Sequence, residues 1–338
     1  MSLLYLTHQG SKLRKDHGCF LVESPDSEAI NIPIREVEHV CIFGNIHLST
    51  SAISTCLYHQ IPVVFLSQTG SYKGHLWNAE CSRQRIESAQ YERFGQPTFQ
   101  MAIARAIVQG KLWNSRQWLM KLNRRRSLVP VADAIAGIHQ DWQKVQRLCL
   151  TVDNLDTLRG YEGAAAARYF PALGQLLKHS DFALTKRTRR PPTDPINSLL
   201  SFGYTLLFNN VLSLLRVEGV NPYLGNLHRS DRHEAQLAFD LMEEFRSPIV
   251  DTLVMQLINQ KVFSLEDFTL PNEDGGVYLK DAARKRFLQG FEQRIMSQVK
   301  HPDSSQAVPY RQVIVLQIRR YKESLLTGAS YETFQRVT

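Results

Sequence analysis

The sequence predicts an α+β fold in which a β-sandwich-like domain, residues 1–78, precedes a larger all-α domain, residues 79–338. Two patterns indicate this division. The first part consists of short runs rich in β-branched and aromatic residues between turn clusters, which is typical of strands. The second part has apolar residues at three- and four-residue steps, which is typical of helices packed on a core. A chain of 338 residues, 43% hydrophobic and 21% charged, is long enough for both domains.

The N-terminal part is predicted to consist of strands, with one helix near residues 51–59. The expected strands are LLYLT, CFLVES, AINIPI, HVCIFG, NIHLS, PVVFLS and GHLW, all between residues 3 and 77. Turn clusters such as DHG, SPDSE and QTGSYKG separate them. Because no reactive side chains concentrate here, we expect a scaffold whose strand edges serve dimerisation.

After Trp77 the pattern changes to helices of several turns. The stretch 96–126 places apolar residues near one face and leaves lysines and arginines, Lys111 among them, available to solvent. A later helix begins after Asp194, a favourable N-cap, with Pro195 at its first position. Its sequence, INSLLSFGYTLLFNNVLSLLRV, is apolar on nearly every side. Such a helix is expected in the middle of an all-α bundle.

Charge is distributed unevenly along the chain. Residues 1–80 hold five Lys/Arg against seven Asp/Glu, whereas the rest of the chain holds 35 against 25. The basic second part favours a polyanionic partner such as nucleic acid, and the alternative is an ordinary basic surface. The five cysteines form no CxxC pair, so neither a disulfide framework nor a cysteine zinc site is indicated. Without a signal peptide or an apolar run of about 18 residues, we expect a cytoplasmic protein with no membrane span.

Glu162 occupies an unexpected position in the run 153–170. The apolar residues of that run recur at helical spacing and define a buried stripe, on which Glu162 also falls; they are Leu155, Leu158, Ala165, Ala166 and Tyr169. An ionised carboxylate in such a position needs compensation, because burying an unpaired charge costs several kcal/mol or more. Three forms of compensation remain open at this point: an arginine, a raised pKa with the proton retained, or a metal ion.

Further potential metal ligands occur in the segment 221–251. His228 follows a glycine turn, and Asp240 and Glu243 are three residues apart on a predicted helix, so their side chains point in similar directions. Together with Glu162 they provide an imidazole and two or three carboxylates, which suit Mn²⁺ or Mg²⁺ better than structural zinc. The alternatives are an ordinary loop histidine and a solvated acidic face paired with the arginine that follows it.

Four segments of the second part are similar to a known family in order and spacing. They are LRGYEGAAAARYF (158–170), PPTDPINSLLSFGYTLL (191–207), NPYLGNLH (221–228) and LAFDLMEEFRSPIVD (237–251). These segments resemble the signature blocks of the CRISPR-associated integrase of the spacer-acquisition module, the Cas-one family. The strand-rich start, RQRIESAQY and VQGKLWNSRQ extend the resemblance over essentially the whole chain. Neither a GxxxxGK[ST] loop nor a GxGxxG motif is present, which argues against an NTPase or a dehydrogenase.

The resemblance implies a β-sandwich domain, a helical catalytic domain, a homodimer, and cutting and joining of DNA that depends on Mn²⁺ or Mg²⁺. Matched residue by residue, the family's metal-binding glutamate, histidine and last acidic ligand correspond to Glu162, His228 and Glu243. The family's additional active-site aspartate corresponds to Asp240. We assign Asp240 an indirect role, either in supporting a metal ligand from behind without touching the ion, or in orienting the nucleophile.

The resemblance further implies a spacer integrase that acts on double-stranded prespacer DNA and the CRISPR repeat with the small ferredoxin-like Cas-two protein. The 3′-hydroxyl of a captured fragment would attack a phosphodiester at the repeat boundary, and water in its place would give endonuclease activity. By charge and location, the candidate DNA contacts are Arg83, Arg85, Lys111, Arg189 and Arg190, with ordinary surface cations as the alternative. Two other functions stay open: a structure-specific metal nuclease acting on branched DNA in repair, and a noncatalytic nucleic-acid-binding scaffold.

Overall fold

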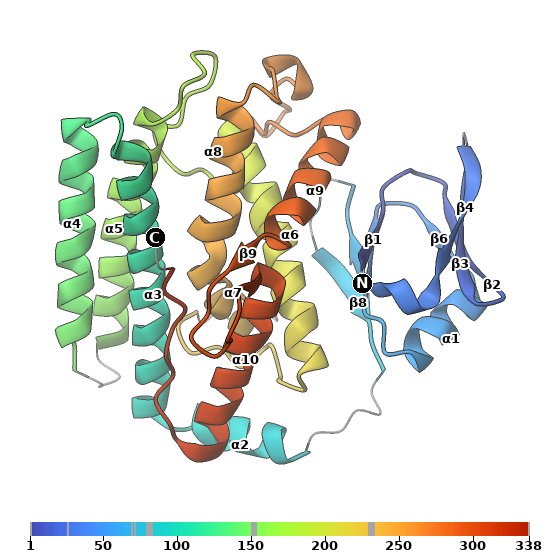
Figure 1. The fold of residues 1–338 in the computed structure, drawn as a ribbon, viewed down its shortest axis with the longest axis horizontal. Helices are drawn as coiled ribbons and strands as arrows, with labels where there is room; N and C mark the ends of the chain where they lie inside the picture. The colour runs from blue at the N-terminus through green and yellow to red at the C-terminus, as the bar shows by residue number, and fades with distance from the viewer. Residues whose placement is uncertain are drawn as a thin grey trace. The chain divides into compact units, whose positions relative to one another are not determined.

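The computed structural model describes residues 2–25, 27–68, 70, 72–78, 84–149, 154–228 and 234–336. The chain divides into two compact units, Met1–Ser82 and Arg83–Thr338 (Figure 1). Strands occupy the first unit and helices dominate the second, in agreement with the predicted fold class. The candidate DNA contact Arg83 and the residues just after the expected boundary at 78 lie outside the described residues.

The described residues of the N-terminal unit form two four-stranded sheets. The strands are β1 (Ser2–Leu6), β2 (Lys12–Asp16), β3 (Cys19–Ser24), β4 (Ser27–Pro33), β5 (Val37–Phe43), β6 (His47–Leu48), β7 (Val63–Leu66) and β8 (Tyr72–Leu76). One sheet has the order β1-β5-β7-β8, in which β5 pairs in parallel with both neighbours and β8 is antiparallel to β7. The other has the order β4-β3-β2-β6, in which the β2–β6 pair is parallel and the rest are antiparallel.

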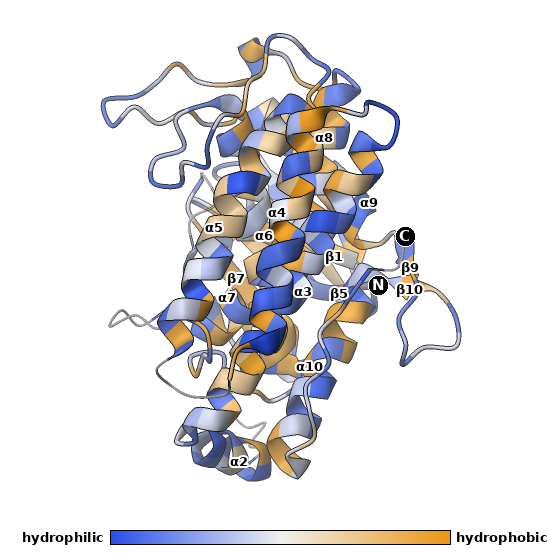
Figure 2. Ribbon diagram, turned by 90° about the vertical axis from the view of Figure 1, so that its left-hand side faces the viewer, coloured by the Kyte–Doolittle hydropathy of each residue, from blue (hydrophilic) through white to orange (hydrophobic). Residues whose placement is uncertain are grey.

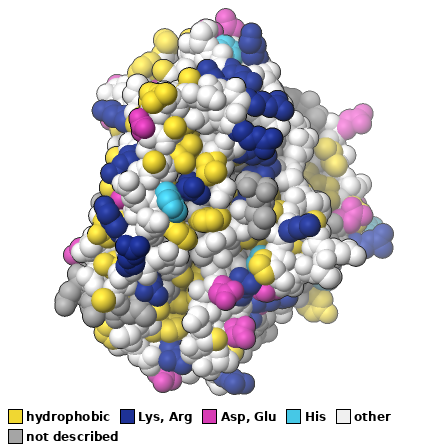
Figure 3. All heavy atoms as spheres, turned by 60° about the vertical axis from the view of Figure 1, so that its left-hand side comes forward, with side chains coloured by type: hydrophobic (Ala, Val, Ile, Leu, Met, Phe, Trp, Pro, Cys, Tyr) yellow, Lys and Arg dark blue, Asp and Glu magenta, His cyan; other side chains and the backbone are white. Residues whose placement is uncertain are grey.

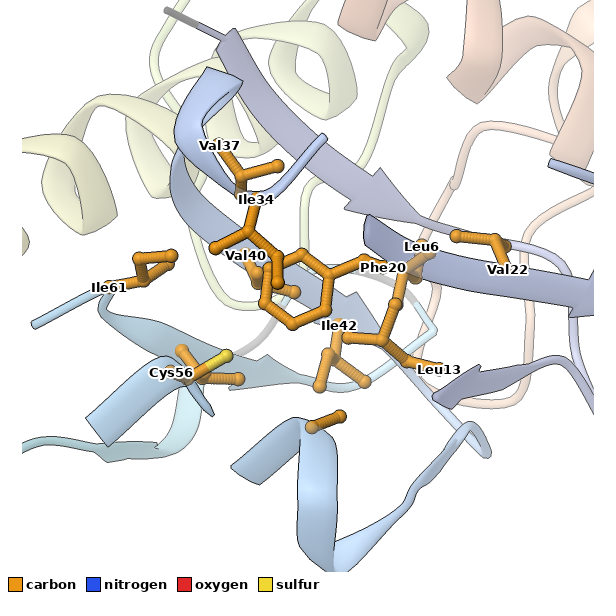
Figure 4. Close-up of a cluster of buried hydrophobic side chains, with 12 residues drawn as sticks. Leu6, Leu13, Phe20, Val22, Ile34, Val37, Val40, Ile42, Cys56 and Ile61 are labelled. Atoms are coloured by element: carbon orange, nitrogen blue, oxygen red, sulfur yellow. The ribbon is translucent and has the colours of Figure 1, made fainter. Parts of the chain in front are cut away.

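Apolar side chains from both sheets and from helix α1 (Thr50–Tyr58) form one buried cluster (Figure 4). Leu13 and Phe20 come from one sheet and Val40 from the other, and each is fully buried. Burying a side chain of this size contributes about 1.5–3 kcal/mol relative to leaving it exposed. The N-terminal unit is therefore stabilised by a core that lies between the two sheets, as a sandwich requires.

Strand β2 is missing from the set of strands that the sequence predicts. Its sequence, KLRKD, is exposed at every position except Leu13, so the apolar alternation that marks a half-buried strand is too weak to detect. The strand forms because antiparallel pairing with β3 satisfies its backbone polar groups and directs Leu13 into the core. The predicted strand NIHLS is shorter than expected, since only His47–Leu48 pairs with β2.

The second unit consists of helices connected by loops (Figure 1). In chain order its elements are α2 (Gln84–Phe94), α3 (Pro97–Asn123), α4 (Val129–Arg147), α5 (Leu155–Gln175), α6 (Pro195–Val217), α7 (Gln236–Met242), the 3₁₀ turn η3 (Glu243–Phe245), the π-helix η4 (Arg246–Asp251), α8 (Thr252–Asn259), the 3₁₀ turn η5 (Leu265–Asp267), α9 (Asp281–Ile295), β9 (Gln298–Val299), β10 (Val308–Pro309) and α10 (Tyr310–Thr327). The short β9–β10 pair and an isolated bridge between Phe268 and Leu279 depart from the all-α prediction.

Helix α6 begins at the predicted residue. Asp194 Oδ1 accepts a hydrogen bond from Asn197 N at 2.8 Å, and Pro195 is the first helical residue. By length and composition alone α6 could cross a membrane, with a mean hydropathy of 1.4 over its most apolar 18 residues, but 83% of that window is buried inside the structure. Contacts with α7, α8, α10 and η4 account for this burial, so α6 is a core helix.

Helix α3 is central to the second unit and positions several site residues. It contacts α4, α5, α7, η3 and η4, and it runs beside α4 and α5 in Figure 1. Figure 2 shows hydrophilic and hydrophobic residues alternating along α3. Since neighbours surround it on several sides, polar residues such as Gln100 and Asn114 are buried. The sequence predicts that the polar and basic side chains of this helix face solvent. In the structure some of its polar side chains are instead buried inside the helical unit.

Candidate metal centre

Helices α3 and α5 and the segment 221–251 bring the predicted site residues together. Helix α5 carries Glu162 and α3 carries Lys111, while Glu243 is the first residue of η3, directly after α7. His228 lies in the loop between α6 and α7. The helical segment from α7 to α8 is irregular, because the 3₁₀ turn η3 and the π-helix η4 lie within it. Such π-helical turns occur frequently at functional sites.

Lys111 connects the two glutamates. Its Nζ donates a hydrogen bond to Glu162 Oε1 and lies 2.7 Å from Glu243 Oε2. The Lys111 side chain is only 13% exposed, so it is not the solvent-facing cation that the helical pattern predicts. It is drawn inward because two carboxylates converge on its ammonium group.

In the structure a lysine compensates the charge of Glu162, and the metal ion that the sequence left open stays a prediction. The Glu162 side chain is 22% exposed and forms an ion pair with a lysine rather than an arginine. The Lys111 ammonium holds the pKa of Glu162 below its ordinary value, against the opposing effect of burial. A retained proton with a raised pKa is therefore wrong, and Glu162 is ionised.

Asp240 fixes the orientation of His228. The Asp240 side chain is fully buried, and its Oδ1 lies 2.7 Å from His228 Nδ1. Backbone N–H groups of Asn226 and Leu227 donate to Oδ2 at 2.5 and 2.9 Å, and that of His228 donates to Oδ1 at 2.9 Å. Since the carboxylate can only accept, Nδ1 carries a proton, and Nε2 is the ring nitrogen left to face the site.

Glu243 lies between His228, Lys111 and Arg246. Its Oε1 is 2.9 Å from Arg246 Nη2 and 3.9 Å from His228 Nε2. Burial alone would raise the pKa of Glu243, but Arg246, Lys111 and His228 outweigh it and lower the pKa to about 2. Glu243 is 2% exposed and Asp240 fully buried, so the alternative of a solvated acidic face is wrong, although the pairing with Arg246 does form.

Arg246 joins the site to a buried network behind it. Its guanidinium lies over the Tyr204 ring, 4.8 Å from the ring centre. Tyr204 and Tyr169 donate hydrogen bonds of 2.5 and 2.7 Å to the two oxygens of Asp251. Burial raises the pKa of Asp251, and the two tyrosine hydroxyls partly offset this effect. The network holds Arg246, so this cation has little freedom to leave Glu243.

Residues 331–336, which we call the C-terminal strap, contact Glu244, the residue that follows Glu243. Glu244 accepts hydrogen bonds from Tyr331 Oη at 2.5 Å and from Phe334 N at 2.6 Å. Asn114, one turn after Lys111 on α3, donates to the carbonyl oxygens of both Glu244 and Phe334. The strap therefore ties η3 to α3 immediately beside the residues that converge at the site.

We expect Glu244→Gln to flatten the pH dependence of stability between about pH 4.5 and 7. Burial raises the pKa of Glu244 from 4.5 to about 7, so the folded protein holds a proton that the unfolded chain releases in this range. This contribution to stability is present below pH 4.5 and is lost as the pH rises through 7, by an amount on the order of 3 kcal/mol. Urea unfolding at pH 5 and pH 7.5 measures it. Equal pH dependence in the two proteins would contradict the prediction.

The site residues fit a divalent cation by their chemistry. As the side chains are arranged, no three His, Cys, Asp or Glu residues of the described chain form a ready cation site, since the Lys111 ammonium lies between Glu162 and Glu243. The donor set nevertheless comprises two carboxylates and an imidazole whose Nε2 can accept an ion. Glu243 Oε2 is buried and accepts no hydrogen bond of regular geometry. These donors suit Mn²⁺ or Mg²⁺.

The candidate DNA contacts are not equivalent in the structure. Arg85, on α2, and Arg189 and Arg190, in the loop before α6, are exposed, and Arg190 lies 3.9 Å from Glu234. Lys111 differs because it belongs to the carboxylate cluster. Figure 3 shows more Lys and Arg side chains than acidic ones on the face in view, with acidic side chains interspersed among them, most clearly in the lower half. The excess of positive charge favours binding of a polyanion.

Three residues of the site are assigned a role by the structure alone. The sequence identifies Lys111 as a cation but not as the partner of Glu162, and it singles out neither Tyr204 nor Asn114. The sequence signals for them are weak: a lysine within a largely apolar helical stretch, and a tyrosine and an asparagine inside apolar helices. Their partners lie far away in sequence, which local periodicity does not reveal.

Comparison with known proteins identifies the family. The family model described as CRISPR associated protein Cas1 matches residues 4–293. The chain belongs to the Cas1 family. The CRISPR-associated endonuclease Cas1 1 of Thermus thermophilus is 36% identical over 331 residues, which cover 98% of each chain. This relationship agrees with the resemblance noted from the sequence.

This chain covers different shares of its other Cas1 relatives. A Cas4 exonuclease/Cas1 endonuclease fusion of Geobacter sulfurreducens is 34% identical over 94% of this chain, and the chain spans only 57% of that fusion. A Cas1 structure from Thermotoga maritima superimposes with a TM-score of 0.81 at 25% identity, over 97% of each chain. A chain in a structure titled Cas6-RT-Cas1–Cas2 complex gives 0.83 at 25% identity, over all of this chain and 36% of that one. The fold described above is thus that of Cas1 proteins.

Proposed function

We propose that this chain is a divalent-metal-dependent DNA endonuclease and integrase of CRISPR adaptation, which inserts captured DNA fragments into the CRISPR array. Family membership supports nuclease and integrase activity. The observation that carries the chemical part is the convergence of Glu162, Glu243 and an Asp240-oriented His228 within the helical unit. The alternatives, a repair nuclease for branched DNA and a noncatalytic scaffold, are not favoured, because the curated relatives are CRISPR-associated endonucleases.

The residues of the site have distinct tasks in this proposal. Glu162, Glu243 and His228 Nε2 would hold Mn²⁺ or Mg²⁺, which supplies Lewis-acid stabilisation of the negative charge on the scissile phosphate. Asp240 keeps the proton of His228 on Nδ1, so the other nitrogen faces the site. Arg246 balances the charge of Glu243 and keeps that carboxylate ionised at neutral pH.

The proposed reaction is attack by a 3′-hydroxyl on a phosphodiester at the repeat boundary. The new bond joins the captured fragment to the array, and the displaced 3′-oxygen of the array leaves. Water in place of the 3′-hydroxyl gives hydrolysis by the same site. The basic surface would hold double-stranded prespacer and repeat DNA by its phosphates, and it contributes register rather than chemistry.

Half-site integration tests the proposed function. The substrates are a DNA duplex with free 3′-hydroxyls and a plasmid that contains the repeat, incubated with the protein, its Cas2 partner and Mn²⁺. We expect covalent joining at the repeat boundary, and no joining with a duplex that ends in 3′-dideoxynucleotides. Metal-dependent cleavage of branched DNA without any joining at the repeat would instead support the repair nuclease.

Cas2 is the proposed protein partner, and we place the protein in the cytoplasm, where the array is. The Cas6-RT-Cas1–Cas2 assembly supports this partner, since a chain of that structure shares the fold of this one. We also propose a homodimer whose contacts involve the N-terminal unit. Its two sheets are open and end in edge strands, which a second copy can cover.

We expect the molecular mass measured in solution at micromolar concentration to be that of a dimer. Light scattering coupled to size-exclusion chromatography measures it, with and without DNA. A monomer under both conditions would contradict the proposed homodimer.

We expect replacement of Arg189 and Arg190 by alanine to weaken DNA binding and to reduce its salt dependence. Each phosphate that is no longer neutralised should lower the log–log slope of affinity against salt by about one. Lys121→Ala, which removes an exposed cation of α3, is the control for a general reduction of positive charge. Filter binding over a salt series measures the slopes. An unchanged slope in the double variant would show that neither arginine neutralises a DNA phosphate.

A further inference from the structure

Lys111 forms ion pairs with both site glutamates. Its Nζ donates to Glu162 Oε1 and lies 2.7 Å from Glu243 Oε2. The second cation near Glu243, Arg246, approaches the other oxygen, Oε1, at 2.9 Å. Lys111 is thus the group that lies between the two carboxylates, whereas Arg246 neutralises one of them from outside.

The two cations differ in their freedom to move. Arg246 is held over the Tyr204 ring, whose hydroxyl is in turn bound to Asp251. Lys111 has a flexible four-carbon side chain and a compact ammonium group, and the ion pairs with Glu162 and Glu243 are the contacts that hold this group. A change of charge between the carboxylates would therefore displace Lys111 before Arg246.

Under the proposed function, on which this step rests, Glu162 and Glu243 are ligands of a divalent ion. An ammonium group and a divalent ion cannot both lie between the same oxygens, because they overlap and repel each other at this distance. We propose that Lys111 is a positioning counter-ion, which holds Glu162 and Glu243 together until a divalent ion displaces its ammonium group. The lysine thus prepares the ligand pair and also competes with the ion for it.

The wild-type protein tests this directly through the reactivity of the lysine amine. Lysines are acetylated with an N-hydroxysuccinimide ester in EDTA and in excess Mn²⁺, and each site is quantified by mass spectrometry. We expect labelling of Lys111 to rise several-fold with Mn²⁺, because its amine leaves the carboxylates, while labelling of the exposed Lys121 stays constant. Unchanged or lower labelling of Lys111 in Mn²⁺-bound protein overturns the proposal.

A variant gives a second, independent measurement. Lys111→Met keeps the length of the side chain and removes its charge, and Lys121→Met is the matched control on the same helix. Titration calorimetry with Mn²⁺ alone should show at least about tenfold tighter binding by Lys111→Met than by wild type, because the competing cation is gone. The control should bind as wild type does. In EDTA, Lys111→Met should also unfold at a lower temperature, and Mn²⁺ should stabilise it more than it stabilises the wild type.

The outcomes separate this inference from the proposed function. If neither the wild type nor Lys111→Met binds Mn²⁺, the metal-dependent function itself fails. If the wild type binds Mn²⁺ and Lys111→Met binds equally or more weakly, Lys111 serves the ion rather than competing with it, and the inference alone is overturned. If the variant does not fold, the labelling of the wild-type protein decides.

Discussion

Glu162→Gln should abolish DNA cleavage and strand transfer while leaving DNA affinity largely unchanged. The substitution keeps the shape of the side chain but removes the negative charge that the proposed ion requires. Removing one electrostatic interaction with a transition state typically slows the reaction by roughly 10²- to 10³-fold, and loss of the ion itself should cost more. Rates of half-site integration and of nicking, measured at saturating DNA, provide the test.

Two further variants help to interpret this result, one as a control and one as a comparison. Asp156→Asn removes a carboxylate from the same helix, but its side chain is 91% exposed and pairs with Arg159, so activity should be retained. His228→Ala removes another proposed ligand and should resemble Glu162→Gln in its loss of activity. Full metal-dependent integration by Glu162→Gln would show that this carboxylate is only the partner of Lys111 within the fold.

The elements that could be predicted are those whose signals are local. Asp194 and Pro195 mark the start of α6 because capping depends on a few adjacent residues, and the apolar character of α6 marks it as a core helix. Strand β2 could not be predicted, since its KLRKD sequence carries one apolar residue and its pairing with β3 decides its conformation. The irregular turns η3 and η4 also depend on tertiary contacts, which the helical periodicity of this segment hides.

The site residues show even more clearly that local sequence patterns do not reveal contacts between distant segments. Periodicity identified Glu162 as a carboxylate that needs a partner, and spacing placed Asp240 and Glu243 on one side of a helix. The partner itself could not be inferred, because Lys111 precedes Glu162 by 51 residues and the helical pattern assigned it to solvent. Only the resemblance to a family connected Glu162 with His228. The structure adds what neither source contains, the position of a lysine between the two glutamates.

Asp240→Asn should destabilise the protein and weaken its metal binding together. Each oxygen of Asp240 accepts from two N–H groups, those of Asn226 and Leu227 on one side and the two of His228 on the other. An asparagine has one acceptor oxygen, so its NH₂ group must face N–H donors whichever way the amide is turned. Buried groups left unsatisfied cost about 1–3 kcal/mol each, which predicts a loss of roughly 2–4 kcal/mol.

The orientation of the amide also determines the state of His228. The better arrangement directs the NH₂ group toward Nδ1, which must then give up its proton and accept a hydrogen bond. The proton moves to Nε2, the nitrogen that faces Glu243, and this nitrogen can no longer bind an ion. Metal affinity should therefore fall by about 10- to 100-fold, as it does when other histidine-orienting groups are lost.

Urea unfolding and Mn²⁺ calorimetry measure the two effects of Asp240→Asn, the loss of stability and the loss of metal affinity. His228→Ala is the comparison, because it should lose the metal while it keeps the three backbone hydrogen bonds to Asp240 and most of the stability. If Asp240→Asn were as stable as His228→Ala and bound Mn²⁺ as the wild type does, Asp240 would have no orienting role.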